Sequence, residues 1–351
     1  MTRGPGPGPV IGQRRAAPRP DAAGVRVVGA PAGRGLPLEV RPAGPGVGLS
    51  EWAARNGDTV RQWLHASGAV LFRGFGVTLP AVAAVTRALA GEPAEYTERS
   101  SPRTQLGEHV YTATDHPADQ AIALHNENSY QASFPAALVF CCLAPAATGG
   151  ATPLADTRQV LAAIPPDVLA PFAERGVLYV RNFGGGLGLS WPEVFQTSRR
   201  EEVDAYCRRH GITAQWRPDG GLRTRQVRPA VAVHPVTGER VWFNHGLFFN
   251  VWSLPAALRT ALLEQFGPED LPSQTYYGDG SPIPDQVLTE LAAAYAAQEV
   301  AVPWAAGDVL VVDNLLAAHG RQAYSGDRRI VVSMAGPVDW GAVDARATGR
   351  S

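Results

Sequence analysis

Residues 124–130 read Leu-His-Asn-Glu-Asn-Ser-Tyr, and this stretch decides how the rest of the chain is interpreted. In an extended segment, side chains two residues apart point the same way, so His125 and Glu127 can face one metal ion while Asn126 faces away. A second imidazole, His319, follows a buried apolar run near the far end of the chain. Two histidines and one carboxylate cover one face of an octahedral metal and leave the other open, the ligand set of non-haem Fe(II) oxygenases.

A single histidine is more often a hydrogen-bonded or surface residue than a metal ligand. We expect hydrogen-bonded or surface roles for five of the histidines: His65, His109, His116, His210 and His234. His125 and His319 differ because the residues around them also match a metal site.

Composition indicates an ordinary globular protein. The 351 residues are 45% hydrophobic and 18% charged, with 31 basic against 32 acidic side chains. This balance gives no reason to expect a nucleic-acid partner, and no apolar run approaches the ~20 residues that cross a bilayer. Three cysteines, Cys141, Cys142 and Cys207, make no disulfide framework and fit a reducing cytoplasm.

The chain is expected to form one folded domain over residues 25–340, with an insertion at roughly 155–225. Residues 1–24, rich in Gly, Pro and Arg, and residues 341–351 are expected to be flexible tails.

Short apolar strands separated by turns dominate the pattern. Residues 136–143, 309–313 and 329–334 read as strands, and residues 48–67 read as a helix. No alternation of strands with crossover helices is visible, so the sequence predicts a mainly β fold with added helices, an antiparallel barrel or jelly roll.

Seven motifs carry a resemblance to a known family. They are Ala69–Phe75, His125–Tyr130, Gly149–Thr152, Trp242–Asn244, Asp313-Asn314, His319–Arg321 and Arg328–Ile330. As a set they resemble the taurine dioxygenase/TfdA family of Fe(II)- and 2-oxoglutarate-dependent oxygenases. The chain looks most like its nonribosomal peptide and antibiotic branch, which includes the syringomycin-pathway aspartate hydroxylase. The resemblance implies a double-stranded β-helix (jelly roll, cupin-like), with Fe(II) as cofactor and 2-oxoglutarate and O2 as co-substrates.

The family's site residues carry over by position. The resemblance makes His125, Glu127 and His319 the metal ligands and catalytic centre, and the intact Glu127 argues against the family's halogenases. Thr152 and Arg329 are the expected 2-oxoglutarate residues, since a bidentate guanidinium suits a carboxylate. Arg328 is the alternative to Arg329, because strand alternation puts only one of the two inside.

Substrate residues are the least defined part of the prediction. Arg103, in the irregular stretch before the metal motif, is a candidate clamp for a substrate carboxylate. The other candidates are Asn244 and His245, at the end of a predicted strand, and Asn126 and Tyr130, beside the predicted ligands.

The predicted reaction is hydroxylation of an unactivated C–H bond. The expected substrate is an amino acid, free or tethered to a carrier protein, in specialised metabolism. Desaturation, epoxidation or cyclisation would use the same oxidant and stay open, as does the oligomeric state. A non-catalytic metal-binding jelly roll would not need Thr152 and Arg329, and a zinc hydrolase is disfavoured because no His-Glu-x-x-His helix is present.

Overall fold

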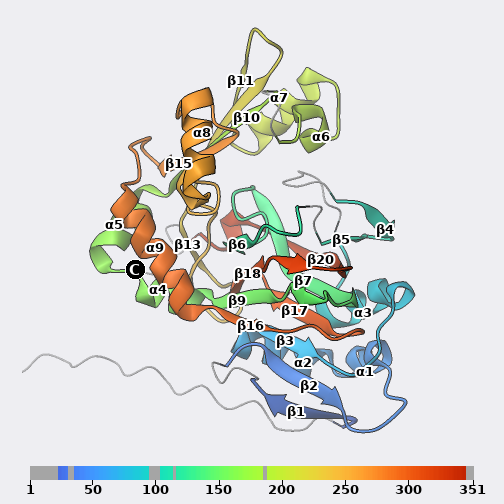
Figure 1. Ribbon diagram of the computed structural model, residues 1–351. Coiled ribbons are helices and arrows are strands. Elements are labelled where there is room, and N and C mark those ends of the chain that lie inside the picture. Colours follow the sequence, from blue (N-terminus) through green and yellow to red (C-terminus); the bar gives the residue numbers. More distant parts are fainter. Residues whose placement is uncertain (1–22, 31–34, 95–102, 114–115, 185–187, 345–351) are drawn as a thin grey trace, which may run out of the picture.

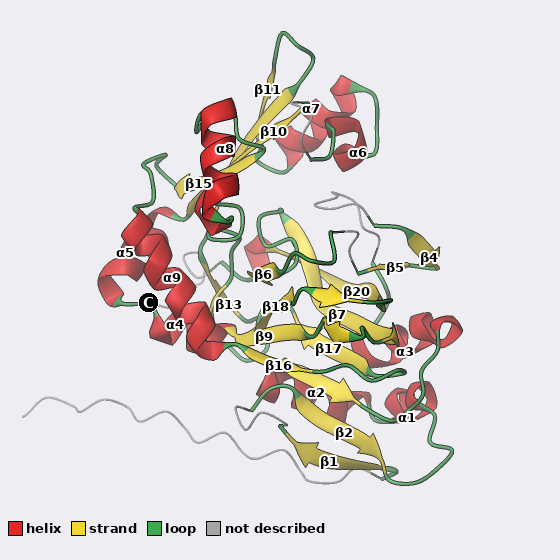
Figure 2. Ribbon diagram, in the orientation of Figure 1, coloured by secondary structure: helices red, strands yellow, loops and turns green. Residues whose placement is uncertain are grey.

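The computed structural model describes the chain with a few gaps, over residues 23–30, 35–94, 103–113, 116–184 and 188–344 (Figure 1). Strands and helices are mixed throughout, so the fold is a mixed α/β fold with many strands (Figure 2). Within the described residues, no helix is long and apolar enough to cross a membrane. Most of the two predicted tails, residues 1–24 and 341–351, lies outside the described residues.

The largest sheet in the described part of the chain has eight strands. In spatial order they are β1 (Val25–Gly29), β2 (Leu38–Pro42), β3 (Ala69–Phe72), β17 (Val309–Asp313), β7 (Ser133–Ala144), β20 (Arg329–Asp339), β5 (Val110–Thr112) and β4 (Gln105–Gly107). All neighbours in it are antiparallel except β2 and β3.

A four-stranded antiparallel sheet packs against the large one. Its order is β16 (Val300–Val302), β9 (Thr152–Asp156), β18 (Ala317–Arg321) and β6 (Ile122–His125). One apolar cluster contains buried side chains from both sheets: Leu138, Phe140 and Leu310 from the large sheet, and Leu154 and Ala317 from the small one. The two predicted histidine ligands lie on strands of this smaller sheet.

A further four-stranded sheet stands beyond the other two, at the top of Figure 1. Its order is β11 (Thr213–Trp216), β12 (Leu222–Arg228), β10 (Val177–Phe183) and β15 (Ser273–Tyr277). It shares an apolar cluster with α6 (Trp191–Phe195) and α7 (Arg200–Arg209). Two strand pairs complete the described sheets: β8 (Thr148–Gly149) with β19 (Tyr324–Ser325), and β13 (Val231–Val233) with β14 (Arg240–Trp242).

Helices pack on the outer side of the large sheet. Residues of α1 (Leu49–Arg55), α2 (Gly57–Ser67) and α3 (Val82–Ala90) share one apolar cluster with Val139, Val311 and Val331 of that sheet. The other helices are α4 (Thr157–Ala163), α5 (Pro166–Arg175), α8 (Ala256–Phe266) and α9 (Asp285–Gln298). Short 3-10 turns occupy Leu79–Ala81, Val251–Ser253 and Trp340–Ala342.

The predicted strands are confirmed as parts of β7, β17 and β20, whereas the predicted helix over residues 48–67 is two helices. Asn56 separates them, because its backbone leaves the helical region (φ −125°, ψ 25°) while its side chain donates to the Trp52 carbonyl at 2.8 Å. Asparagine competes for main-chain hydrogen bonds in this way, which favours a helix end over a helix interior.

The turn after β17 joins the predicted ligand segments. The carboxamide of Asn314 accepts from the Glu127 N–H (2.7 Å) and donates to the carbonyls of Glu127 (2.9 Å) and Pro135 (2.8 Å). Asn126 donates back to the Asn314 carbonyl at 2.6 Å. All of these groups are buried, so these hydrogen bonds satisfy backbone N–H and C=O groups that would otherwise have to bond to water.

We predict that Asn314→Ala lowers the free energy of unfolding by about 3 kcal/mol, because it leaves main-chain groups buried without partners at roughly 1–3 kcal/mol each. Urea denaturation followed by fluorescence measures this loss. The exposed Gln286 provides a control, and Gln286→Ala should stay within about 0.5 kcal/mol of the parent. Equal stabilities of the two variants would contradict a supporting role for Asn314.

Candidate metal and co-substrate site

Strand pairing brings the three predicted ligands together. β6 and β18 are antiparallel neighbours in which His125 lies directly opposite His319, so both imidazoles leave the same face of the small sheet. Glu127 follows two residues after His125 and is 2% exposed. The predicted i, i+2 relation therefore places the carboxylate beside both rings.

The ligand atoms converge on one point. Glu127 Oε2 lies 3.9 Å from His125 Nε2 and 3.7 Å from His319 Nε2, and the three ligand atoms lie within 4.8 Å of one another. Neighbouring ligands of an ion bound at about 2.1 Å stand roughly 3 Å apart, so a small closing movement completes the site. The donor set of two imidazoles and one carboxylate fits Fe(II).

The surroundings of both histidines favour the neutral imidazole. Nδ1 of His125 donates to the Ala123 carbonyl at 2.9 Å, which fixes the tautomer and turns the Nε2 lone pair toward Glu127. Burial lowers the pKa of His125 and lowers the pKa of His319 well below its usual value. Neutral imidazole is the form that binds a metal, so burial keeps both rings competent at neutral pH.

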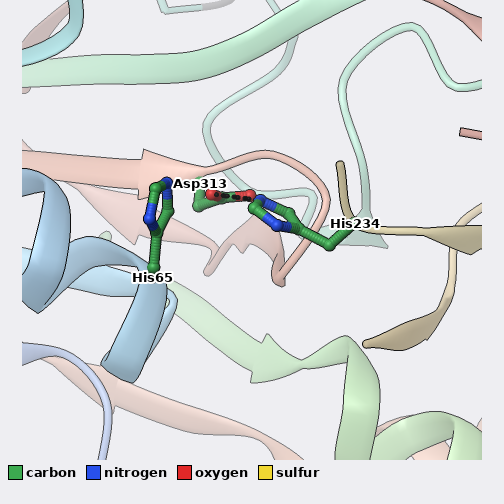
Figure 3. Close-up of side chains that lie close together, drawn as sticks. All are labelled: His65, His234 and Asp313. Atoms are coloured by element: carbon green, nitrogen blue, oxygen red, sulfur yellow. Dashed lines mark hydrogen bonds and ion pairs between the residues drawn. The ribbon is translucent and has the colours of Figure 1, made fainter. Parts of the chain in front are cut away.

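A second cluster of similar composition lies elsewhere and combines His65 of α2, His234 after β13 and Asp313 at the end of β17 (Figure 3). Nδ1 of His234 accepts from the backbone N–H groups of Val236 (3.3 Å) and Thr237 (3.0 Å). The ring proton is therefore on Nε2, which donates to Asp313 Oδ2 at 3.1 Å.

This hydrogen-bond pattern disfavours a metal at the second cluster. Nε2 of His234 would have to lose its proton while Nδ1 still faces two donors, which requires an anionic ring. The other oxygen of Asp313 accepts from the N–H groups of Leu315 and Leu316, both at 3.0 Å. The His234–Asp313 pair thus braces the turn that carries Asn314, and the predicted hydrogen-bonding role of His234 is confirmed.

Arg103 contacts the carboxylate of Glu127, the predicted metal ligand. Its Nη2 donates to Glu127 Oε1 at 2.9 Å, and the two side chains are 7% and 3% exposed. The sequence suggested a clamp for a substrate carboxylate, but the carboxylate that Arg103 contacts in the structure belongs to the protein. Sequence spacing could not show this, because 24 residues separate the partners in an irregular stretch.

The two adjacent arginines at the start of β20, Arg328 just before it and Arg329 as its first residue, differ sharply. Arg329, the first choice from the sequence, is 67% exposed and lies 3.7 Å from Asp327, so the structure does not support it as a pocket residue. Arg328 is partly buried, donates to the Gly150 carbonyl at 2.9 Å and lies over the Tyr324 ring. Burial, reinforced by the nearby charge of Arg321, lowers the pKa of Arg328 to about 10. The alternative residue is the one that faces inward.

The Gly149-Gly150 turn makes room for that arginine. Gly150 has φ +71°, and a Cβ placed there would lie 3.0 Å from Arg328 Cδ. A Cβ on Gly149 would lie 2.3 Å from the Ala323 carbonyl oxygen, so the chain could not approach so closely. Thr152 follows at the start of β9, where its hydroxyl accepts from Trp304 Nε1 at 3.2 Å.

Two predicted substrate residues instead hold the main chain. Nδ2 of Asn244 donates to the Ala230 carbonyl (2.9 Å), and its Oδ1 accepts from the Gly246 N–H (2.8 Å). Asn126 is buried and donates to the Asn314 turn. These bonds join the amide groups of both asparagines to the backbone and do not by themselves support a substrate contact.

His245 and Tyr130 line the side of His125. The rings of His245 and His125 lie 5.7 Å apart, and Tyr130 packs edge-on against His245 at 5.2 Å. Ser129 Oγ lies 2.5 Å from His245 Nδ1, and burial lowers the pKa of His245 well below its usual value. Sequence reasoning missed Phe248, which stacks on His125 at 4.4 Å; its place three residues after His245 was the available signal.

Comparisons with known proteins agree with this geometry. A family model described as "Taurine catabolism dioxygenase TauD, TfdA family" matches residues 34–335. Dapdiamide synthesis protein DdaC from Enterobacter agglomerans is 40% identical over 276 residues, covering 78% of this chain and 84% of that protein. A clavaminate synthase-like protein from Arabidopsis thaliana is 30% identical over 282 residues, covering 77% and 82%.

Solved structures match the fold at low sequence identity. PvcB, described as an Fe, alpha-ketoglutarate dependent oxygenase from an isonitrile synthetic pathway, superimposes with a TM-score of 0.52. The match covers 92% of this chain and 93% of PvcB at 16% identity. The PvcB protein from Pseudomonas aeruginosa gives the same score at 19% identity and 88% and 90% coverage. These likenesses concern the fold alone.

Removing one histidine from each cluster shows which of the two clusters binds a metal. We predict that His319→Ala weakens Co(II) binding by more than about 100-fold. Losing a ligand should reduce the affinity more than losing a group that only hydrogen-bonds to a ligand, which costs roughly 10- to 100-fold. His65→Ala should bind Co(II) like the parent. The visible absorption of bound Co(II), titrated without oxygen, measures both affinities. The reverse order would place the metal at His65, His234 and Asp313.

Proposed function

The chain belongs to the taurine catabolism dioxygenase TauD/TfdA family and is an Fe(II)- and 2-oxoglutarate-dependent oxygenase, and we propose that it hydroxylates an unactivated C–H bond of an amino acid. The amino acid is free or tethered to a carrier protein, and the pathway makes a specialised metabolite. The proposal rests on the convergence of His125, Glu127 and His319.

We assign the metal to His125, Glu127 and His319, which bind three positions and leave the opposite side open for co-substrate. Bound iron with 2-oxoglutarate supplies the oxidant, and the protein supplies orientation and a shielded pocket. The rings of His245 and Phe248 pack against His125 and would keep water from that side. Tyr130, packed against His245, would hold this wall in place.

We assign the distal carboxylate of 2-oxoglutarate to Arg328, with Thr152 as the second contact. Among the described residues, Arg328 has a carbonyl and an aromatic ring as neighbours but no carboxylate. A partly buried cation without an anion is unfavourable, so an anionic ligand is expected there. Arg73 is the contrast, because Asp308 already accepts from it at 2.7 Å.

We further propose that the two packed sheets are the halves of a double-stranded β-helix, a jelly roll. β7, β17 and β20 belong to one half and β6, β9 and β18 to the other. The third sheet, with β10, β11 and β12, would then be part of the predicted insertion in one domain over residues 25–340. The buried free thiols of the three cysteines support the proposed cytoplasmic location.

The substrate class is proposed from relatives. One is a dapdiamide synthesis protein and another is clavaminate synthase-like, which supports a role in a specialised-metabolite pathway. Glu127 keeps the third protein ligand in place, which disfavours halide binding. Epoxidation, desaturation and cyclisation remain the alternative outcomes, because they differ only in where the substrate radical lies.

Mass spectrometry of the products tests this proposal. Purified protein with Fe(II), 2-oxoglutarate and oxygen is given a panel of amino acids, free or loaded on a carrier protein, and succinate is quantified. Gain of one oxygen by a saturated substrate supports hydroxylation, whereas loss of two hydrogens indicates desaturation or ring closure. Oxygen gained at a double bond indicates epoxidation. Failure of every amino-acid substrate to stimulate succinate formation would refute the substrate class.

The arginine assignment has its own test. We predict that Arg328→Gln weakens 2-oxoglutarate binding by roughly 10- to 100-fold, because hydrogen bonds to a charged group contribute about 1.5–3 kcal/mol. Arg329→Gln is the matched control and should bind like the parent. The visible charge-transfer band of the anaerobic Fe(II)–2-oxoglutarate complex measures both affinities. A larger loss in the Arg329 variant would reverse the assignment.

A further inference from the structure

The two oxygens of Glu127 have different neighbours. Oε2 faces Nε2 of His125 and of His319, at 3.9 and 3.7 Å, whereas Oε1 accepts from Arg103 Nη2 at 2.9 Å. Arg103 thus binds the carboxylate oxygen that the imidazoles do not face. One oxygen is left for the metal and the other is occupied by a cation.

Burial makes this contact important. The side chains of Arg103 and Glu127 are 7% and 3% exposed, so neither charge is well hydrated. Breaking a buried ion pair by removing one partner leaves the other charge uncompensated, so the contact holds both side chains in place.

The backbone of Glu127 is held separately. Asn314 accepts from its N–H and donates to its carbonyl, which fixes the start of the side chain. The side chain of glutamate has three rotatable bonds, so a fixed backbone still leaves its end free to turn. A donor on Oε1 removes that freedom.

We propose that Arg103 is a positioning residue for the proposed metal ligand Glu127: it holds Oε1 and presents Oε2 alone to the metal. This inference rests on the proposed ligand set and adds a residue that orients it. Glu127 would then ligate through one oxygen, which leaves more of the coordination sphere for 2-oxoglutarate and oxygen. The expected substrate clamp is the competing role, and the two roles predict different losses.

The test measures metal binding without 2-oxoglutarate or substrate. Arg103→Gln should weaken Co(II) binding roughly 10- to 100-fold, the usual cost of losing a group that orients a ligand. Arg103→Lys should recover part of the loss, because an ammonium keeps the charge but not the fixed fork. Arg41→Gln is the control, since it removes the arginine of another arginine–glutamate pair, with Glu39, outside the site.

The visible Co(II) spectrum gives a second readout. If Arg103 restricts Glu127 to one oxygen, the spectrum of the Arg103→Gln variant should shift as the carboxylate becomes free to bind through both. Thermal unfolding of the metal-free proteins checks that each variant folds. If Arg103→Gln does not fold, the Co(II) affinity and spectrum of Arg103→Lys test the proposal instead.

Unchanged Co(II) affinity and spectrum in a folded variant would overturn the positioning role. If substrate KM alone then rises, Arg103 is the substrate clamp that the sequence suggested. Because no turnover is needed, these measurements are independent of whether the proposed substrate class is correct. Loss of Co(II) binding in His319→Ala shows separately whether the ligand set itself is right.

Discussion

The carboxamide of Asn314 is the contact on which the site depends. It bonds both main-chain groups of Glu127 and the Pro135 carbonyl, so the turn after β17 is tied to the segment that leaves β6. His234 and Asp313 hold that turn from the other side. Because β18 starts just beyond it, one buried turn sets the positions of Glu127 and His319 together.

Three arginines that are partly or fully buried differ in the groups that balance their charge. Arg73 is balanced by Asp308, and Arg103 is balanced by Glu127, the proposed metal ligand. Arg328 faces a carbonyl and an aromatic ring, with no carboxylate among the described residues. A protein interior tolerates the first two as ion pairs, whereas the third is stabilised when an anion binds. We therefore propose a structural role for Arg73, a positioning role for Arg103 and a ligand-binding role for Arg328.

Two histidine–acid clusters of similar composition have opposite chemistry. At His125, Nδ1–H donates a hydrogen bond to a carbonyl, so Nε2 is free to bind a metal. At His234, backbone N–H groups donate to Nδ1, so Nε2 carries the proton and donates it to a hydrogen bond with Asp313. Proximity of suitable atoms does not make a metal site by itself. The hydrogen bonds that fix the tautomer decide which cluster can bind.

The sequence alone identified the family and predicted the ligand trio, because both depend on local spacing and on short motifs. It did not predict β6 and β18, the strands that carry the two histidines. Tertiary structure decided the rest. The pairing of β20 with β7 is irregular at Arg329, so simple alternation could not say that Arg328 faces inward. The contacts of Arg103 with Glu127 and of Asn126 with Asn314 could not be predicted, because these partners meet only when segments apart in the sequence pack together. Long-range hydrogen bonds and charge pairs leave no periodic signal in the chain.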